Sequence, residues 1–212
     1  MKWFVCIVVV SFLCSACSDE DAAAVSATGT VVFEYADMQS APEMRMAVFV
    51  QLASEAQRAD TVCVEHEETK LQWFVEHPLV ITNASRQWAG YTNLQSISGE
   101  TIPTGQYTVL YSDKAQTEDD SMFLLSYPQE LCTAPLTQAL TVLHDSVKKR
   151  IVLYNTDGQL LFCDTQKTVW HTAAAIQKDF PTASTFRYYY LSQRADIAVL
   201  TPIKSIQFYG EH

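Results

Sequence analysis

Cysteines are the first residues in this chain whose type and spacing could do chemistry, and Cys14 and Cys17 form its only C-x-x-C. Two thiols at this spacing can make a redox pair or half of a zinc site, because both sulfurs can reach one partner. Their surroundings argue against both. Lys2 precedes a largely apolar run from Trp3 to Leu13, which gives way to a row of acids. This order is typical of a secretory signal, whereas a membrane span needs about 20 apolar residues.

A second group of potential metal ligands follows an expected strand and comprises Cys63, Glu65, His66, Glu67 and Glu68. Successive side chains on a strand point to opposite faces, so Cys63, Glu65 and Glu67 are separated from His66 and Glu68. Side chains on opposite faces of a strand cannot coordinate the same metal ion. We therefore expect an exposed acidic turn and no metal site.

Three cysteines remain after Cys17, namely Cys63, Cys132 and Cys163. Their spacings match no pattern of metal ligands. In an oxidising compartment one pair could form a disulfide, and the alternative is that all three are buried thiols. The sequence leaves the pairing open.

No pattern that usually carries catalysis is present, neither a G-x-S-x-G nucleophile turn, an H-E-x-x-H zinc motif nor a glycine-rich phosphate loop. His144, Asp145 and His171 have no identifiable nucleophile as a partner. We therefore expect a protein that is not an enzyme and that uses no cofactor.

Aromatic side chains are the remaining candidates for ligand contact. Tyr188, Tyr189 and Tyr190 are consecutive, so on a strand the ring of Tyr189 points away from its neighbours. Exposed aromatic rings can stack on sugars or fill a partner's pocket, and Trp88 and Tyr91 are further candidates. The alternative is that these rings are structural and pack under a loop.

The charge of the chain limits its partners. The formal net charge is −10, with 24 acidic against 14 basic side chains. An acidic surface repels phosphate backbones and anionic lipids, so we expect no nucleic acid partner and no electrostatic adsorption to a membrane. The hydrophobic share of 48% is sufficient for a packed core.

Alternation of apolar and polar residues predicts strands along most of the chain, as where Val31, Phe33 and Tyr35 share one face. The fold class expected is all-β, with one or two antiparallel β-sandwich domains of the immunoglobulin or transthyretin kind and little helix. The thirteen candidate strands are Thr30–Tyr35, Met44–Leu52, Thr61–Glu65, Leu71–Glu76, Leu79–Thr82, Gln87–Leu94, Tyr107–Tyr111, Met122–Ser126, Arg150–Tyr154, Gln159–Asp164, Thr185–Leu191, Ala195–Leu200 and Ile203–Tyr209.

Several local features refine this pattern. Asp157-Gly158 predicts a primed turn in a hairpin between residues 150 and 163. The stretch from Leu136 to Val147 is compatible with helix or strand, and Trp170–Phe180 predicts a short helix that ends before Pro181. The polar run Ser112–Ser121 predicts a boundary between domains at 29–113 and 120–212. The alternative is a long loop within one sandwich.

The residues Ser15, Ala16 and Cys17 resemble the lipobox of bacterial lipoproteins. This resemblance implies a signal peptide at 1–16, a lipid on Cys17 that anchors the protein to the outer membrane, and a tether at 17–28. The alternative is an ordinary signal with Cys17 as a free thiol. The residues after Cys17 are Ser18, Asp19, Glu20 and Asp21. They resemble the export signal of surface lipoproteins in Gram-negative anaerobes, which implies a location on the cell exterior. The alternative is that they form only an acidic tether.

Three segments, Gly29–Tyr35, Ala41–Phe49 and Ile102–Val109, resemble the N-terminal β-sandwich of fimbrillin-type and fimbrial-anchor lipoproteins. In the last segment Pro103 and Gly105 suit a turn before Tyr107 enters the core. The resemblance implies a fimbrial or adhesin-like accessory or anchor protein whose partner joins by β-strand addition. The alternative function is a surface lipoprotein that binds a glycan or a peptide.

Overall fold

The computed structural model describes residues 24–53, 56–96, 100–143 and 147–210. The expected signal peptide, the lipidation site Cys17 and the acidic residues 18–21 lie outside the described residues. Within them the chain is mostly β, which confirms the expected fold class. The elements are β1 (Ala24–Glu34), β2 (Glu43–Leu52), β3 (Ala59–His66), β4 (Gln72–Glu76), β5 (Leu79–Asn83), β6 (Arg86–Leu94), β7 (Gly105–Asp113), β8 (Glu118–Leu125), α1 (Leu136–Leu143), β9 (Val147–Asn155), β10 (Leu160–Asp164), α2 (Ala173–Asp179), β11 (Ala183–Ser192), β12 (Ile197–Leu200) and β13 (Lys204–Ser205), with 3-10 turns at Ala56–Arg58, Gln129–Cys132 and Ile206–Phe208.

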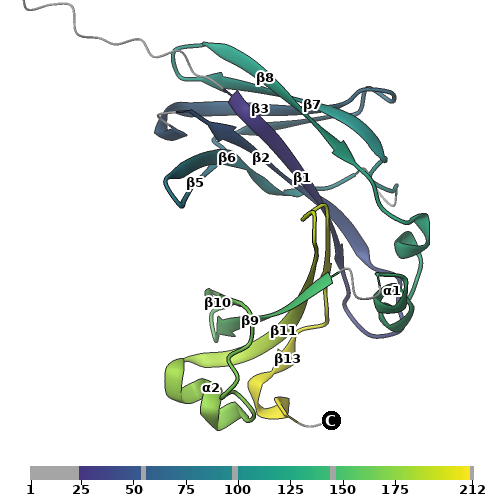
Figure 1. Ribbon diagram of the computed structural model, residues 1–212, viewed down its shortest axis with the longest axis vertical. Helices are drawn as coiled ribbons and strands as arrows, with labels where there is room; N and C mark the ends of the chain where they lie inside the picture. Colours follow the sequence, from purple (N-terminus) through teal and green to yellow (C-terminus); the bar gives the residue numbers. More distant parts are fainter. Residues whose placement is uncertain (1–23, 54–55, 97–99, 144–146, 211–212) are drawn as a thin grey trace, which may run out of the picture.

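The strands form two sheets (Figure 1). The long sheet has the order β10-β9-β11-β12-β1-β2-β6-β5, and β13 pairs with β11. The short sheet has the order β4-β3-β7-β8. Every pair is antiparallel except β1 with β12, which run parallel. The short sheet covers the β1-β2-β6-β5 end of the long sheet to form a sandwich, and the other strands of the long sheet extend beyond it (Figure 1).

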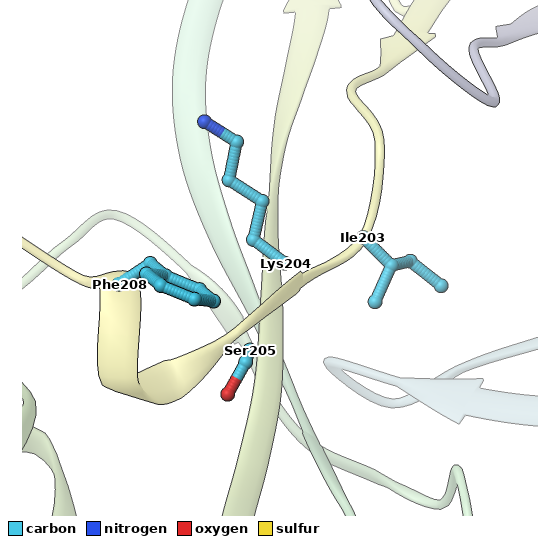
Figure 2. Close-up of a pocket in the computed structure, with 4 residues that line it drawn as sticks. All are labelled: Ile203, Lys204, Ser205 and Phe208. Atoms are coloured by element: carbon cyan, nitrogen blue, oxygen red, sulfur yellow. The ribbon is translucent and has the colours of Figure 1, made fainter.

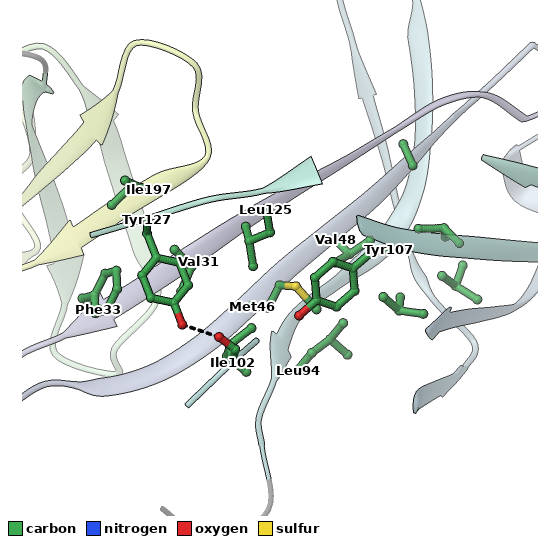
Figure 3. Close-up of a cluster of buried hydrophobic side chains, with 14 of the residues drawn as sticks. Val31, Phe33, Met46, Val48, Leu94, Ile102, Tyr107, Leu125, Tyr127 and Ile197 are labelled. Carbon is green, nitrogen blue, oxygen red and sulfur yellow. Dashed lines mark hydrogen bonds between the residues drawn. The ribbon is translucent and has the colours of Figure 1, made fainter. Parts of the chain in front are cut away.

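Alternation along the strands builds the sandwich core. Val31 and Phe33 of β1 and Val48 of β2 are fully buried, and they meet side chains of the short sheet in one cluster (Figure 3). Tyr107 is also fully buried, and its hydroxyl donates to the Pro103 carbonyl at 2.6 Å. The predicted entry of this ring into the core is therefore confirmed.

A second core lies on the part of the long sheet that the short sheet does not cover. Ile151 and Leu153 of β9 pack there with Ile176 of α2 and with Trp170, which precedes that helix. The indole of Trp170 donates to the Asp179 carboxylate at 3.0 Å. This core explains the helix predicted at residues 170–180, because α2 buries one face against the sheet.

The expected linker at residues 17–28 is wrong from residue 24 onward, since Ala24–Glu34 is one continuous strand. Gly29, the next residue of this strand, is small because of close packing rather than flexibility. A Cβ at Gly29 would lie 2.0 Å from the ring of Phe123 in β8. That ring is itself stacked on Tyr107, with centroids 5.0 Å apart. The sandwich therefore includes residues 24–28 and does not start at residue 29.

The expected domain boundary at Ser112–Ser121 is instead the hairpin between β7 and β8, which pair from Ser112 with Glu118 onward. The Asp113 carboxylate closes the turn by accepting the N–H groups of Ala115 and Thr117 at 2.8 and 3.0 Å. The polar composition of this segment therefore reflects a tight turn and not a boundary between domains. Because β12 also pairs with β1, the C-terminal half shares a sheet with the N-terminal half.

Three local expectations were also resolved. The stretch compatible with helix or strand forms α1 up to Leu143. The last expected strand is reduced to Lys204–Ser205, followed by a 3-10 turn. In the β9–β10 hairpin Gly158 has a φ of 76°, but Asp157 has no positive φ. The predicted primed turn is therefore wrong, and a three-residue loop with one left-handed glycine replaces it.

We predict that Gly29→Val destabilises the protein by about 1–3 kcal/mol, because overpacking forces the stacked Phe123 ring to move. The matched control is Thr28→Val, since Thr28 neighbours Gly29 on β1 and points to the opposite face. Urea denaturation followed by tryptophan fluorescence measures both. Equal stability of the two variants would contradict the close approach of β1 and β8.

Candidate functional site

The structure separates the aromatic candidates. Tyr188 packs against the second core and Tyr190 against the sandwich core, while Tyr189 lies on the opposite face of β11. We call this opposite face, which points away from both cores, the outer face of the long sheet. Trp88 of β6 lies on it too, but β2, β1 and β12 lie between it and Tyr189, about 19 Å across the sheet. The strand register offsets the two residues by a further eight positions, about 27 Å, along the strands. Tyr91 is 38% exposed on the other side of β6. The candidates do not form one aromatic site.

His66, the histidine of the possible metal cluster, is 1% exposed and already bonded on both ring nitrogens. Its Nδ1 accepts the Thr69 N–H at 3.2 Å, which places the ring proton on Nε2. That nitrogen lies 3.1 Å from the Thr104 carbonyl, to which it donates. Among the described residues no group of histidine, cysteine and acidic side chains could hold a metal ion.

The three cysteines of the fold are free thiols on separate elements. Cys63 lies on β3, Cys132 in a 3-10 turn and Cys163 on β10. Burial raises the pKa of the half-buried Cys63 and Cys132 thiols above the ordinary value, which disfavours the reactive thiolate, whereas Cys163 is exposed.

A charged row crosses the outer face of the long sheet. The Glu34 carboxylate accepts from Arg187 at 2.5 Å and from Arg45 at 3.3 Å. Arg187 also donates to the Tyr154 hydroxyl at 3.0 Å, and Arg45 donates to the Thr92 carbonyl. Burial alone would raise the pKa of Glu34, but the two guanidinium groups together hold it below its ordinary value. The row links five strands of the sheet, from β9 to β6.

One hollow of about 500 Å³ lies beside β13 and is lined by Ile203, Lys204, Ser205 and Phe208 (Figure 2). Ile203 and Phe208 are each 57% exposed, so its apolar walls face solvent. Its polar groups are the Lys204 amine, which extends away from the backbone, and the Ser205 hydroxyl (Figure 2). Because the Ser205 hydroxyl already accepts the Gln207 N–H, the hollow presents few groups that could orient a ligand.

The open edges of the sheets are the remaining sites where a partner could bind. Within the described residues β4, β5, β8 and β10 each pair on one side only. Native proteins protect such edges with charges or bulges, because unpaired backbone groups recruit other strands. β8 carries three acids, β4 ends at Glu76, and β10 has a register shift after Leu160 and ends at Asp164. β5 has neither a charge nor a bulge.

β5 also presents apolar side chains beside its open edge. Leu79 and Ile81 are 47% and 42% exposed on the outer face of the long sheet. On the neighbouring strand β6, Trp88 pairs with Ile81, and Gly90 pairs with Leu79. The ring of Phe49 covers Gly90. Strand edge and patch together make β5 the candidate functional site.

Sequence reasoning found this strand but missed its role. The prediction of Leu79–Thr82 as a strand is correct within one residue. Its edge position follows from the pairing order, which alternation does not specify. A usable signal was present, because residues 77–85 contain no Asp, Glu, Lys or Arg in a strongly acidic chain.

Comparisons with known proteins leave the site to be interpreted from its geometry. No protein-family model matches the chain, and no curated protein sequence matches it. Neither helix in the described part of the chain is long and apolar enough to cross a membrane.

We predict that Glu34→Gln lowers the free energy of unfolding by about 1 kcal/mol at pH 7, because it leaves the largely buried Arg187 side chain without a counter-charge. The folded-state pKa of Glu34 lies below 4.5. Its contribution is therefore fully present above about pH 4.5 and is lost as the pH falls through the folded pKa. Urea denaturation of both proteins between pH 7 and pH 3 should show the difference shrinking in acid.

The control for this measurement is Glu76→Gln, since Glu76 is exposed at the end of β4 and forms no ion pair within the described structure. A Glu34→Gln effect that stays constant down to pH 3, or that equals the effect of the control, would contradict the ion-pair row.

Proposed function

We propose that this chain is a lipid-anchored protein of the bacterial cell envelope that works by assembly, accepting a β-strand from a protein partner at β5. It acts as an accessory or anchor subunit of a fimbria-like or adhesin-like structure. The lipid on Cys17 holds it in the outer membrane, and the acidic residues from Ser18 to Asp21 direct it to the cell exterior. Neither a cofactor nor catalysis has a part in this function.

The anchoring part of the proposal rests on the N-terminal sequence. Lipoprotein processing requires a charged start, an apolar run and small residues before a cysteine. Lys2, the run from Trp3 to Leu13, and Ser15 and Ala16 before Cys17 supply these features. Because the acids after Cys17 make adsorption to anionic lipid unfavourable, a covalent lipid supplies the membrane attachment.

The assembly part rests on one observation, the unprotected edge of β5. Main-chain hydrogen bonds at such an edge give affinity, and side chains on alternate positions give specificity. Leu79 and Ile81 supply apolar contacts on one face of the added strand. Of the other described edges, β4, β8 and β10 carry acids or a bulge, and β13 is only two residues long. A partner strand therefore pairs with β5 in preference to them.

The alternative function, binding of a glycan or peptide by aromatic side chains, has less support. Stacking on a sugar requires rings that converge on one surface. Trp88 and Tyr189 share the outer face but lie far apart, about 19 Å across the sheet and about 27 Å along the strands. Tyr188 and Tyr190 pack toward the cores. The edge of β5 therefore supports assembly better than small-ligand binding.

Metabolic labelling tests the anchor. Cells grown with radiolabelled palmitate should label the wild-type protein, and Cys17→Ala should remove the label, because the lipid is attached at that residue. Cys63→Ala, which leaves the N-terminal segment intact, is the control and should remain labelled. Label that persists in Cys17→Ala would exclude lipidation at this site.

Photo-crosslinking on intact cells of the native host tests the edge. We predict that p-benzoylphenylalanine in place of the exposed Thr82 gives covalent adducts, because a partner strand lies against β5. The same group in place of Leu160, exposed on the bulged edge strand β10, is the matched control and should give few. An absence of adducts at Thr82, at equal expression, would contradict assembly through β5.

A further inference from the structure

The turn after β5 determines which backbone groups point to its open edge. β5 and β6 are joined by Ala84 and Ser85, whose φ angles are 47° and 66°, as a two-residue primed turn requires. In such a hairpin the flanking residues Asn83 and Arg86 exchange both hydrogen bonds, and alternate residues follow the same pattern. Ile81 and Leu79 therefore bond to β6, while Val80 and Thr82 direct their N–H and C=O groups outward.

These two outward residues make β5 complementary to itself. In an antiparallel pair of β5 strands centred on Ile81, Val80 of each copy faces Thr82 of the other, and both exchange hydrogen bonds. A pair centred on Val80 would set Thr82 against Pro78, which has no N–H to donate. A pair centred on Thr82 would set Val80 against Ala84, which lies in the turn. Only the register centred on Ile81 uses all the free groups.

Charge favours the same arrangement. Two copies of a chain with a net charge of −10 repel each other over most of their surfaces, but residues 77–85 carry no formal charge. Glu76 precedes β5 and Arg86 follows its turn, and neither forms an ion pair within the described residues. The uncharged stretch between them leaves the edge of β5 without the repulsion that opposes contact between copies elsewhere.

The apolar patch continues across the same axis. Ile81 pairs with Trp88 on the outer face, and in the register centred on Ile81 the two isoleucines are directly opposite each other. Residues in such a non-hydrogen-bonded pair have Cα atoms about 4.5 Å apart, which brings their side chains into contact. The contact joins the Trp88 and Ile81 side chains of both copies into one apolar strip.

We infer that the partner strand at β5 is β5 of a second copy of this chain, paired antiparallel about a two-fold axis at Ile81. The two long sheets thereby become one continuous sheet. This inference rests on the proposed function and names the partner in it.

Disulfide formation tests this register. The background is the full-length protein, purified from membranes in detergent, with Cys63, Cys132 and Cys163 replaced by serine. In it Ile81→Cys should form a covalent dimer on mild oxidation, because Cα atoms about 4.5 Å apart are within disulfide range. Leu79→Cys is the matched control, equally exposed on the same face, but its two copies would lie about 14 Å apart. We expect about tenfold more dimer from Ile81→Cys.

Three results would overturn the inference: no covalent dimer from Ile81→Cys, equal covalent dimer from both variants, or a covalent dimer already formed in the serine background. Failure here is distinguishable from failure of the proposed function. If Thr82 crosslinks on cells to proteins of other masses while Ile81→Cys stays monomeric, assembly at β5 stands and the second copy is excluded. If neither experiment gives an adduct, both proposals fail.

Discussion

The pairing of β1 on both of its sides is the constraint on which the rest of the structure depends. β1 is antiparallel to β2 along almost its whole length and parallel to β12 from Val31 to Glu34. Its inward side chains build the sandwich core, and its outward Glu34 binds arginines from β2 and β11. Because β1 belongs to both regions, the sandwich and the C-terminal strands form one sheet with two cores instead of two separate domains.

That shared strand also determines where partners can bind. With β1 in the middle of the long sheet, the sheet ends at β10 on one side and at β5 on the other. β10 is bulged and ends at an acid, whereas β5, of the same length, is regular, uncharged and flanked by apolar side chains. The acidic surface that keeps copies apart elsewhere leaves this edge as the place where they can meet. Position in the sheet thus gives an ordinary strand its proposed role in assembly.

The sequence predicts local structure well here and the arrangement poorly. Alternation locates twelve strands, and Pro181 marks the end of α2 to within a few residues, because these signals arise from neighbouring residues. The parallel pairing of β1 with β12 brings together residues more than 160 positions apart, and no local pattern encodes it. The small residues before Gly29 suggest a linker from composition alone, yet they form the first half of β1. The polar run after Ser112 suggests a boundary, yet Asp113 folds it into a turn.

The candidate site was likewise only partly predictable, since the absence of charge near β5 is visible in the sequence but the open edge of β5 is not.

Amide hydrogen exchange, measured by NMR at increasing protein concentration, tests the central claim most directly. The outward amides of Val80 and Thr82 should exchange rapidly in dilute protein and about tenfold more slowly as copies pair. The amide of Ile81, which already bonds to β6, should change little. Exchange at Val80 and Thr82 that does not depend on concentration would contradict the pairing of copies through β5.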